Sequence, residues 1–135
     1  MNNEIKKHEV MNLLIDVCPS YKKRWEEYLK DNYEENDEPL LYIDISDFAH
    51  HVAELHKKGQ HEEFPAIFEL VERLHIDGDE IVREAATIGI LEDIQRHAGN
   101  HDGIKKFLHP ESLKWWNHLD DFWSGRTEYV GGPKE

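Results

Sequence analysis

The sequence predicts an all-α fold in which antiparallel helix pairs stack side by side. Apolar residues recur with helical spacing along most of the chain, whereas strict alternation of apolar and polar residues never lasts long enough to build a sheet. The nearest strand candidate is the short run 40–45, which follows Pro39. Pro and Gly interrupt the helical patterns at intervals that fit short connections. We therefore expect about five to seven helices.

The N-terminal part of the chain is expected to form two helices. The first covers about residues 4–16 and the second about residues 20–33, with Pro19 between them. One face of the second helix is apolar and largely aromatic, and its residues are Tyr21, Trp25, Tyr28 and Leu29. The acidic run 34–38 and the following Pro39 end this helix, because like charges repel and proline cannot continue a helix.

Three further helices are expected in the middle of the chain. The third starts after an N-cap at Asp44 or Ser46 and ends near Gly59. The fourth has Pro65 in its first turn, where a missing N–H costs nothing. The fifth covers about residues 80–97 and is apolar over most of its circumference. It is therefore expected in the middle of the stack, with neighbours on two sides.

The last expected helix begins at Pro110 and carries most of the tryptophans. Its apolar and aromatic residues share a sector of about 120° at 100° per residue. They are Trp115, Trp116, Leu119, Phe122 and Trp123. The segment 124–135 contains Gly-Gly-Pro and is expected to be a loosely attached tail. The domain prediction is therefore one helical domain over residues 1–123.

The composition restricts the classes of partner. The chain of 135 residues has 16 basic and 29 acidic side chains, which gives a formal net charge of −13. Such a surface repels nucleic acids and anionic membranes and favours basic partners. Cys18 is the single cysteine, so neither an intramolecular disulfide nor a cysteine-based zinc site can form. We expect it to be a small buried residue, and we expect a cytoplasmic protein, since neither a signal peptide nor a membrane span is recognisable.

The run 79–91 resembles the second helix of a HEAT-type repeat. The matching residues are Asp79, Val82, Arg83, Ala86 and Gly89. Since one copy is recognisable, the resemblance implies a short helical stack. The turn 77–79 is expected to cap the helix, and Arg83 is expected to bond to Asp77 or Asp79 and to have a structural role.

The segment 107–123 resembles the C-terminal signature of a family of small acidic bacterial proteins of unknown function. The matching pattern is Phe-Leu, a gap, Pro-Glu-Ser, a gap, Trp-Trp, and then Leu and Phe-Trp. The family also carries an Ile- and Leu-rich helix that ends in Gly-Asn, as residues 88–100 do. The resemblance implies fold and lineage, and it implies no activity or functional residue.

Ten histidines raise the alternative of a metal site. Its candidate ligands are His50, His51, Asp93 and His97, of which the last two lie one helical turn apart. A catalytic metal site needs three or four converging ligands, and the paired Glu-x-x-His motifs of helical di-metal sites are missing from the sequence. Surface histidines that bind solvent or hydrogen-bonding partners are the alternative explanation.

Two features are candidates for binding a partner protein. One is the acidic run, with Glu34, Glu35, Asp37 and Glu38, and the other is Trp115, which lies at the edge of the aromatic sector. A solvated connection is the alternative for the acidic run, and packing into the core is the alternative for the tryptophans.

The sequence shows neither a recognisable catalytic set nor a cofactor motif. We therefore expect a non-catalytic, acidic protein-binding module, in particular an immunity- or antitoxin-like inhibitor of a basic protein. A metal-binding protein or metal-dependent enzyme is the alternative, and a homodimer through the tryptophan-rich helix is a further one.

Overall fold

The computed structural model describes residues 4–34 and 40–123. This part of the chain is helical, apart from short turns and one isolated parallel bridge between Ile5 and Gly78. The all-α prediction is confirmed. The α-helices are α1 (Val10–Val17), α2 (Lys22–Asn32), α3 (Leu41–Lys57), α4 (Phe64–Asp77), α5 (Glu80–Glu84), α6 (Glu92–His97) and α7 (Pro110–Trp123). Short 3-10 turns span Lys7–Glu9, Pro19–Tyr21 and Asp102–Phe107.

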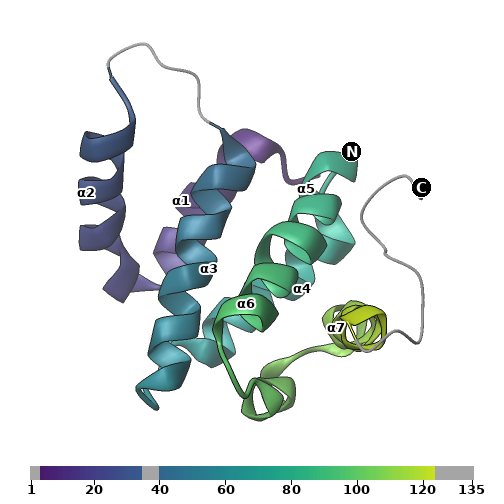
Figure 1. Cartoon of the computed structure of the whole chain (residues 1–135). Coiled ribbons are helices and arrows are strands. Elements are labelled where there is room, and N and C mark those ends of the chain that lie inside the picture. Colours follow the sequence, from purple (N-terminus) through teal and green to yellow (C-terminus); the bar gives the residue numbers. More distant parts are fainter. Residues whose placement is uncertain (1–3, 35–39, 124–135) are drawn as a thin grey trace.

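A long helix over residues 80–97 forms the centre of the fold. It consists of α5, a π-helical segment Ala85–Leu91 and α6, and it packs against α3 on one side and α4 on another (Figure 1). The predicted central position of this helix is therefore confirmed. The Asp79 carboxylate accepts a hydrogen bond from the backbone N–H of Val82 at 2.9 Å and caps the helix, as the sequence predicts.

Helix α3 and the long helix run in the same direction. Near the start of both, the Tyr42 hydroxyl donates to Glu84 at 2.7 Å. Further along, the ring of His50 in the middle of α3 contacts the ring of His97 at the end of the long helix, with centroids 3.8 Å apart. Helix α4 runs in the opposite direction, since only the short turn around Gly78 joins its end to the start of α5. The more specific prediction of HEAT-like stacking stays a prediction.

The first two helices pack onto this centre from the α3 and α4 sides. Helix α1 lies against α4. Helix α2 is held to α3 by polar side chains, because the Tyr21 hydroxyl donates to Asp47 at 2.7 Å and Arg24 forms an ion pair with the same carboxylate at 3.0 Å. Tyr21 also packs edge-on against Phe48 and is fully buried.

The predicted start of the third helix, after an N-cap at Asp44 or Ser46, is wrong. Helix α3 already starts at Leu41, so the nearest strand candidate is helical, and helical spacing places Ile45 and Phe48 in the core. Asp44 is not an N-cap, because it lies within α3. Its side chain is buried, and its carboxylate accepts hydrogen bonds from the Tyr28 and Tyr33 hydroxyls. Local capping signals therefore mislead here.

The start of the first helix also differs from its prediction. The α-helical conformation begins at Val10, after a 3-10 turn, because the preceding segment pairs with the turn after α4 instead. The backbone N–H of Ile5 donates to the Asp77 carbonyl at 2.9 Å, and the Ile5 carbonyl accepts from the Asp79 N–H at 3.0 Å.

Helix α7 lies across α4 and the π-helical segment and closes the core (Figure 1). Trp116 and Leu119 are fully buried, which confirms the core role for these two residues of the aromatic sector. Trp115 and Phe122 are half-buried. The Trp123 side chain and the predicted tail 124–135 lie outside the described residues.

Cys18 is fully buried at the end of α1, as the sequence predicts. Burial raises the pKa of its thiol to about 12, and the nearby Glu63 carboxylate adds to this rise. The thiol is therefore protonated and shielded at neutral pH.

Candidate functional site

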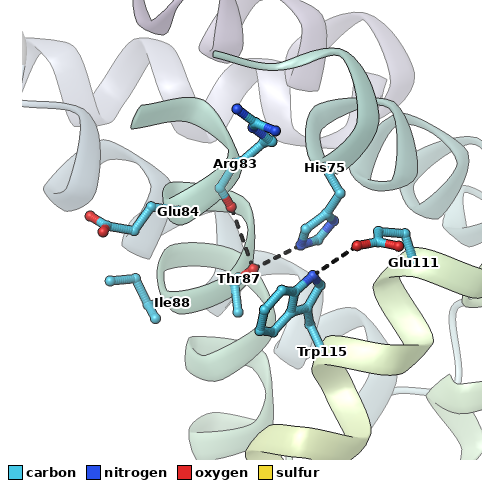
Figure 2. Close-up of a pocket in the computed structure, with 7 residues that line it drawn as sticks. All are labelled: His75, Arg83, Glu84, Thr87, Ile88, Glu111 and Trp115. Carbon is cyan, nitrogen blue, oxygen red and sulfur yellow. Dashed lines mark hydrogen bonds between the residues drawn. The ribbon is translucent and has the colours of Figure 1, made fainter. Parts of the chain in front are cut away.

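A pocket of about 270 Å³ lies where α4, the long central helix and α7 meet (Figure 2). Thr87 and Ile88 of the π-helical segment line one wall, and Trp115 of α7 lines the facing wall. His75 of α4 and Glu111 of α7 complete this side, and Arg83 stands at the opposite edge from Trp115 in Figure 2. π-Helical turns are rare and occur often at functional sites.

The floor of the pocket is a buried chain of hydrogen bonds. His75 Nδ1 lies 3.0 Å from the Val71 carbonyl oxygen, which can only accept, so this nitrogen carries a proton. His75 Nε2 then accepts a hydrogen bond from the Thr87 hydroxyl at 2.9 Å. Burial lowers the pKa of His75, so the ring is neutral at pH 7.

Glu72 joins the N-terminus of α7 to this network. Its carboxylate accepts hydrogen bonds from the backbone N–H groups of Glu111 and Ser112 at 3.0 and 2.8 Å, and from the Ser112 hydroxyl at 2.9 Å. Burial raises the pKa of Glu72, but these three hydrogen bonds outweigh burial and leave the pKa below its ordinary value. Helix α7 is therefore positioned by a charged cap supplied from α4.

The charged groups at the pocket rim differ in their partners. Glu84 accepts a hydrogen bond from Tyr42. Glu111 accepts from the Trp115 indole at 3.2 Å and forms an ion pair with Lys114 at 3.1 Å. The Arg83 guanidinium makes no ion pair with any described residue, so the predicted bond to Asp77 or Asp79 is wrong. Asp79 instead uses its carboxylate to cap α5.

A second surface feature is the end of the molecule at which α3 and α5 begin and α4 ends (Figure 1). Four aliphatic side chains there are exposed to between 49% and 61%, and we call them the apolar end: Leu40, Ile43, Ile76 and Ile81. Exposed carboxylates of Asp77, Glu80 and Glu84 belong to the same end. This end therefore combines apolar area with negative charge.

Residues 11–124 match the family model of a domain of unknown function, DUF7674. The chain belongs to this family. The expectation of a family of unknown function is therefore confirmed, and the matched range includes every residue that lines the pocket. No curated protein and no solved structure matches the chain.

The partner-binding candidates have different positions in this DUF7674 domain. Trp115 lies at the pocket, half-buried, with Lys114 over its ring at 4.9 Å. Glu34 is exposed after the end of α2. Glu35, Asp37 and Glu38 lie outside the described residues. No sequence signal predicts the pocket itself, because its walls come from three separate helices whose packing the sequence does not specify.

The four metal-ligand candidates of the DUF7674 domain do not gather in one place. His50 and His97 contact each other, but His51 bonds to the Ser20 hydroxyl on the α2 side, and Asp93 forms an ion pair with Arg96. Within residues 4–34 and 40–123, three or more potential ligands nowhere gather around a common point. In the same ranges, no helix is long and apolar enough to span a membrane.

A serine–histidine–glutamate cluster at the start of α2 was missed in the sequence. The Ser20 hydroxyl lies 2.9 Å from His51 Nε2 and donates to Glu63, which also accepts from the Ser20 backbone N–H. Glu63 thus caps the turn that leads into α2, and the arrangement fastens the first helical pair to α3 and α4. The residues are distant in sequence, so spacing alone could not reveal them.

Histidine burial predicts a loss of stability in mild acid. Burial lowers the pKa of His75, His61, His97 and His51, each below the ordinary 6.5. Nearby cationic side chains lower the pKa further, and they include Lys106 at His61 and Arg96 at His97. The unfolded chain therefore binds more protons, so the free energy of unfolding falls as the pH drops below about 6.5.

Urea unfolding at about pH 7.5 and about pH 5.5 measures this loss. We expect His75→Gln to reduce the difference in the free energy of unfolding between the two pH values. An equal difference in the wild type and in His75→Gln would show that His75 does not couple folding to protonation. Glu72 acts in a separate window, because its stabilisation is lost only below its ordinary pKa of 4.5.

Proposed function

We propose that this DUF7674 domain is a non-catalytic protein-binding module whose apolar end docks onto a basic partner. The observation that carries the proposal is the set of four aliphatic side chains exposed at one end beside Asp77, Glu80 and Glu84. Contact regions of proteins combine a central apolar area with a polar rim, and charges on the rim speed association with an oppositely charged partner.

The charge of the chain supports a basic partner. The formal net charge is −13, and the acidic run 34–38 ends two residues before Leu40, the first residue of the apolar end. We propose more specifically an immunity- or antitoxin-like inhibitor in a bacterial cytoplasm. A basic toxin that acts on nucleic acid fits this role, because an acidic inhibitor competes with the same phosphate charges.

The residues of the C-terminal signature support the fold. Its Ser112 is buried on Glu72, and its Trp116 and Leu119 fill the core. We propose that the signature marks this bacterial family because it holds α7 in place, while the surface of the apolar end selects the partner.

The proposal is tested with Ile43→Asp and Ile81→Asp, each used as bait beside the wild type in extracts of the source cells. Both positions lie in the first turn of a helix, where an added carboxylate is compatible with the helix dipole, so folding should be preserved. We expect the wild type to retain a basic protein, identified by mass spectrometry. With that partner purified, each variant should bind at least ~10-fold more weakly.

Ala66→Asp is the matched control. Ala66 is exposed in the first turn of α4, at the other end of the molecule, and the substitution adds the same charge. We expect it to bind like the wild type, with an affinity that falls as salt is added. Equal binding by all four proteins, or a partner that is not basic, contradicts the proposal. Inhibition of the partner's own activity tests the more specific inhibitor role, and light scattering detects a second copy of the chain as the occupant of the apolar end.

A further inference from the structure

We propose that the pocket beside Trp115 binds a small molecule that carries a carboxylate on a flat apolar body. This proposal does not depend on the docking function of the apolar end, although Glu84 belongs to both surfaces. It rests on the volume of the pocket, on the chemistry of its walls and on the charge of Arg83, which forms no ion pair with a described residue.

The volume sets the size of the ligand. The pocket measures about 270 Å³, whereas a cavity of about 150 Å³ holds a benzene ring. An aromatic ring with a short polar arm therefore fits, and a nucleotide or a lipid chain does not.

Trp115 and Ile88 supply the surface for the apolar body. The indole of Trp115 is held in position by its hydrogen bond to Glu111 and by Lys114 above the ring. An aromatic ligand gains from stacking or edge contact with a positioned indole. Ile88 is only half-buried in the central helix and adds aliphatic area on the facing wall.

The charges select an anion. Glu84, Glu111 and Lys114 already have partners, and His75 is neutral because its buried Nδ1–H and Nε2 are both used. Among the described residues, the Arg83 guanidinium has neither an ion pair nor a side-chain hydrogen bond, whereas Glu84 accepts from Tyr42 and Glu111 pairs with Lys114. A guanidinium binds a carboxylate through two parallel hydrogen bonds, so a planar carboxylate matches it better than a point-like anion.

Protein NMR with three probes tests the proposal. The indole N–H signals of the four tryptophans are followed during titration with phenylacetate, phenylacetamide and inorganic phosphate at constant ionic strength. Trp115→Phe assigns the Trp115 signal. We expect phenylacetate to shift that signal saturably with a millimolar dissociation constant, and phenylacetamide to bind at least ~10-fold more weakly. Phosphate should leave the indole signal in place.

Two exposed-arginine variants separate a specific site from general attraction. Arg83→Gln should remove the preference for phenylacetate over its amide, whereas Arg73→Gln, on the exposed face of α4, should keep it. Circular dichroism confirms that both variants fold. The proposal is overturned if acid and amide bind equally to the wild type, if Arg83→Gln keeps the preference, or if no saturable shift occurs up to ~20 mM phenylacetate.

Discussion

Trp116→Ala is expected to destabilise the protein by about 3–5 kcal/mol, the usual cost of truncating a buried aromatic side chain. Trp116 is fully buried between α7 and the central helix, and its ring packs edge-on against His101 with centroids 5.2 Å apart. The indole N–H has no hydrogen-bond partner among the described residues, so the cost comes from lost packing. Since domains are stable by about 5–15 kcal/mol, the variant should lose much of its stability. Urea and thermal unfolding measure the loss.

Trp115→Ala is the control for this prediction. It removes the same side chain one residue earlier, from a half-buried position at the pocket. We expect a loss of less than half that of Trp116→Ala, because less packing is removed. Equal losses at both positions would show that α7 does not bury Trp116 as described.

Gly78→Ala is expected to have the second largest effect, about 1–3 kcal/mol or more. A Cβ atom at this position would lie 2.4 Å from the Leu74 carbonyl oxygen and 2.5 Å from Val82 Cγ1. The backbone of the turn between α4 and α5 must then move, and with it the bridge to Ile5. The free energy of unfolding from urea titration gives the size of the effect.

Gly103→Ala provides a matched substitution at a permissive site. Its Cβ would meet His56 at 3.5 Å, which is an ordinary van der Waals contact. We expect little change in stability there. If both alanine variants unfold at the same urea concentration, the close approach at Gly78 does not determine the stability of the turn.

Much of the fold follows from the sequence because the strongest signals are local. Helical spacing placed α4, the central helix and α7 close to their observed bounds, with Pro65 in the first turn of α4 and Asp79 as a cap. The apolar circumference of residues 80–97 correctly predicted neighbours on two sides.

The errors arise where distant residues decide the local conformation. Asp44 looks like a helix cap in sequence, but two tyrosine hydroxyls from the α2 region use its carboxylate inside α3. Residues 4–9 have helical composition, yet Ile5 pairs with the turn after α4. The π-helical segment has no distinct sequence signal, and close packing of Gly89 against Ile45 accompanies it in the structure.

The candidate site was less predictable than the fold. Trp115 was identified as a residue at the edge of the aromatic sector, but the sequence could not place it opposite Arg83. The structural role expected for Arg83 assumed that the nearest acids in sequence were its partners. Asp79 instead caps the helix, which leaves the guanidinium at the rim of the pocket.

The burial of Cys18 makes its thiol a natural probe of local opening. It is the only sulfhydryl in the chain, fully enclosed and protonated at neutral pH, so a maleimide or disulfide reagent has one target that it cannot reach in the closed molecule. The rate of labelling under native conditions therefore measures how often the junction after α1 separates from α4. No engineered probe is needed, and the effects of substitutions in distant helices on local opening can be compared through the labelling rate of Cys18.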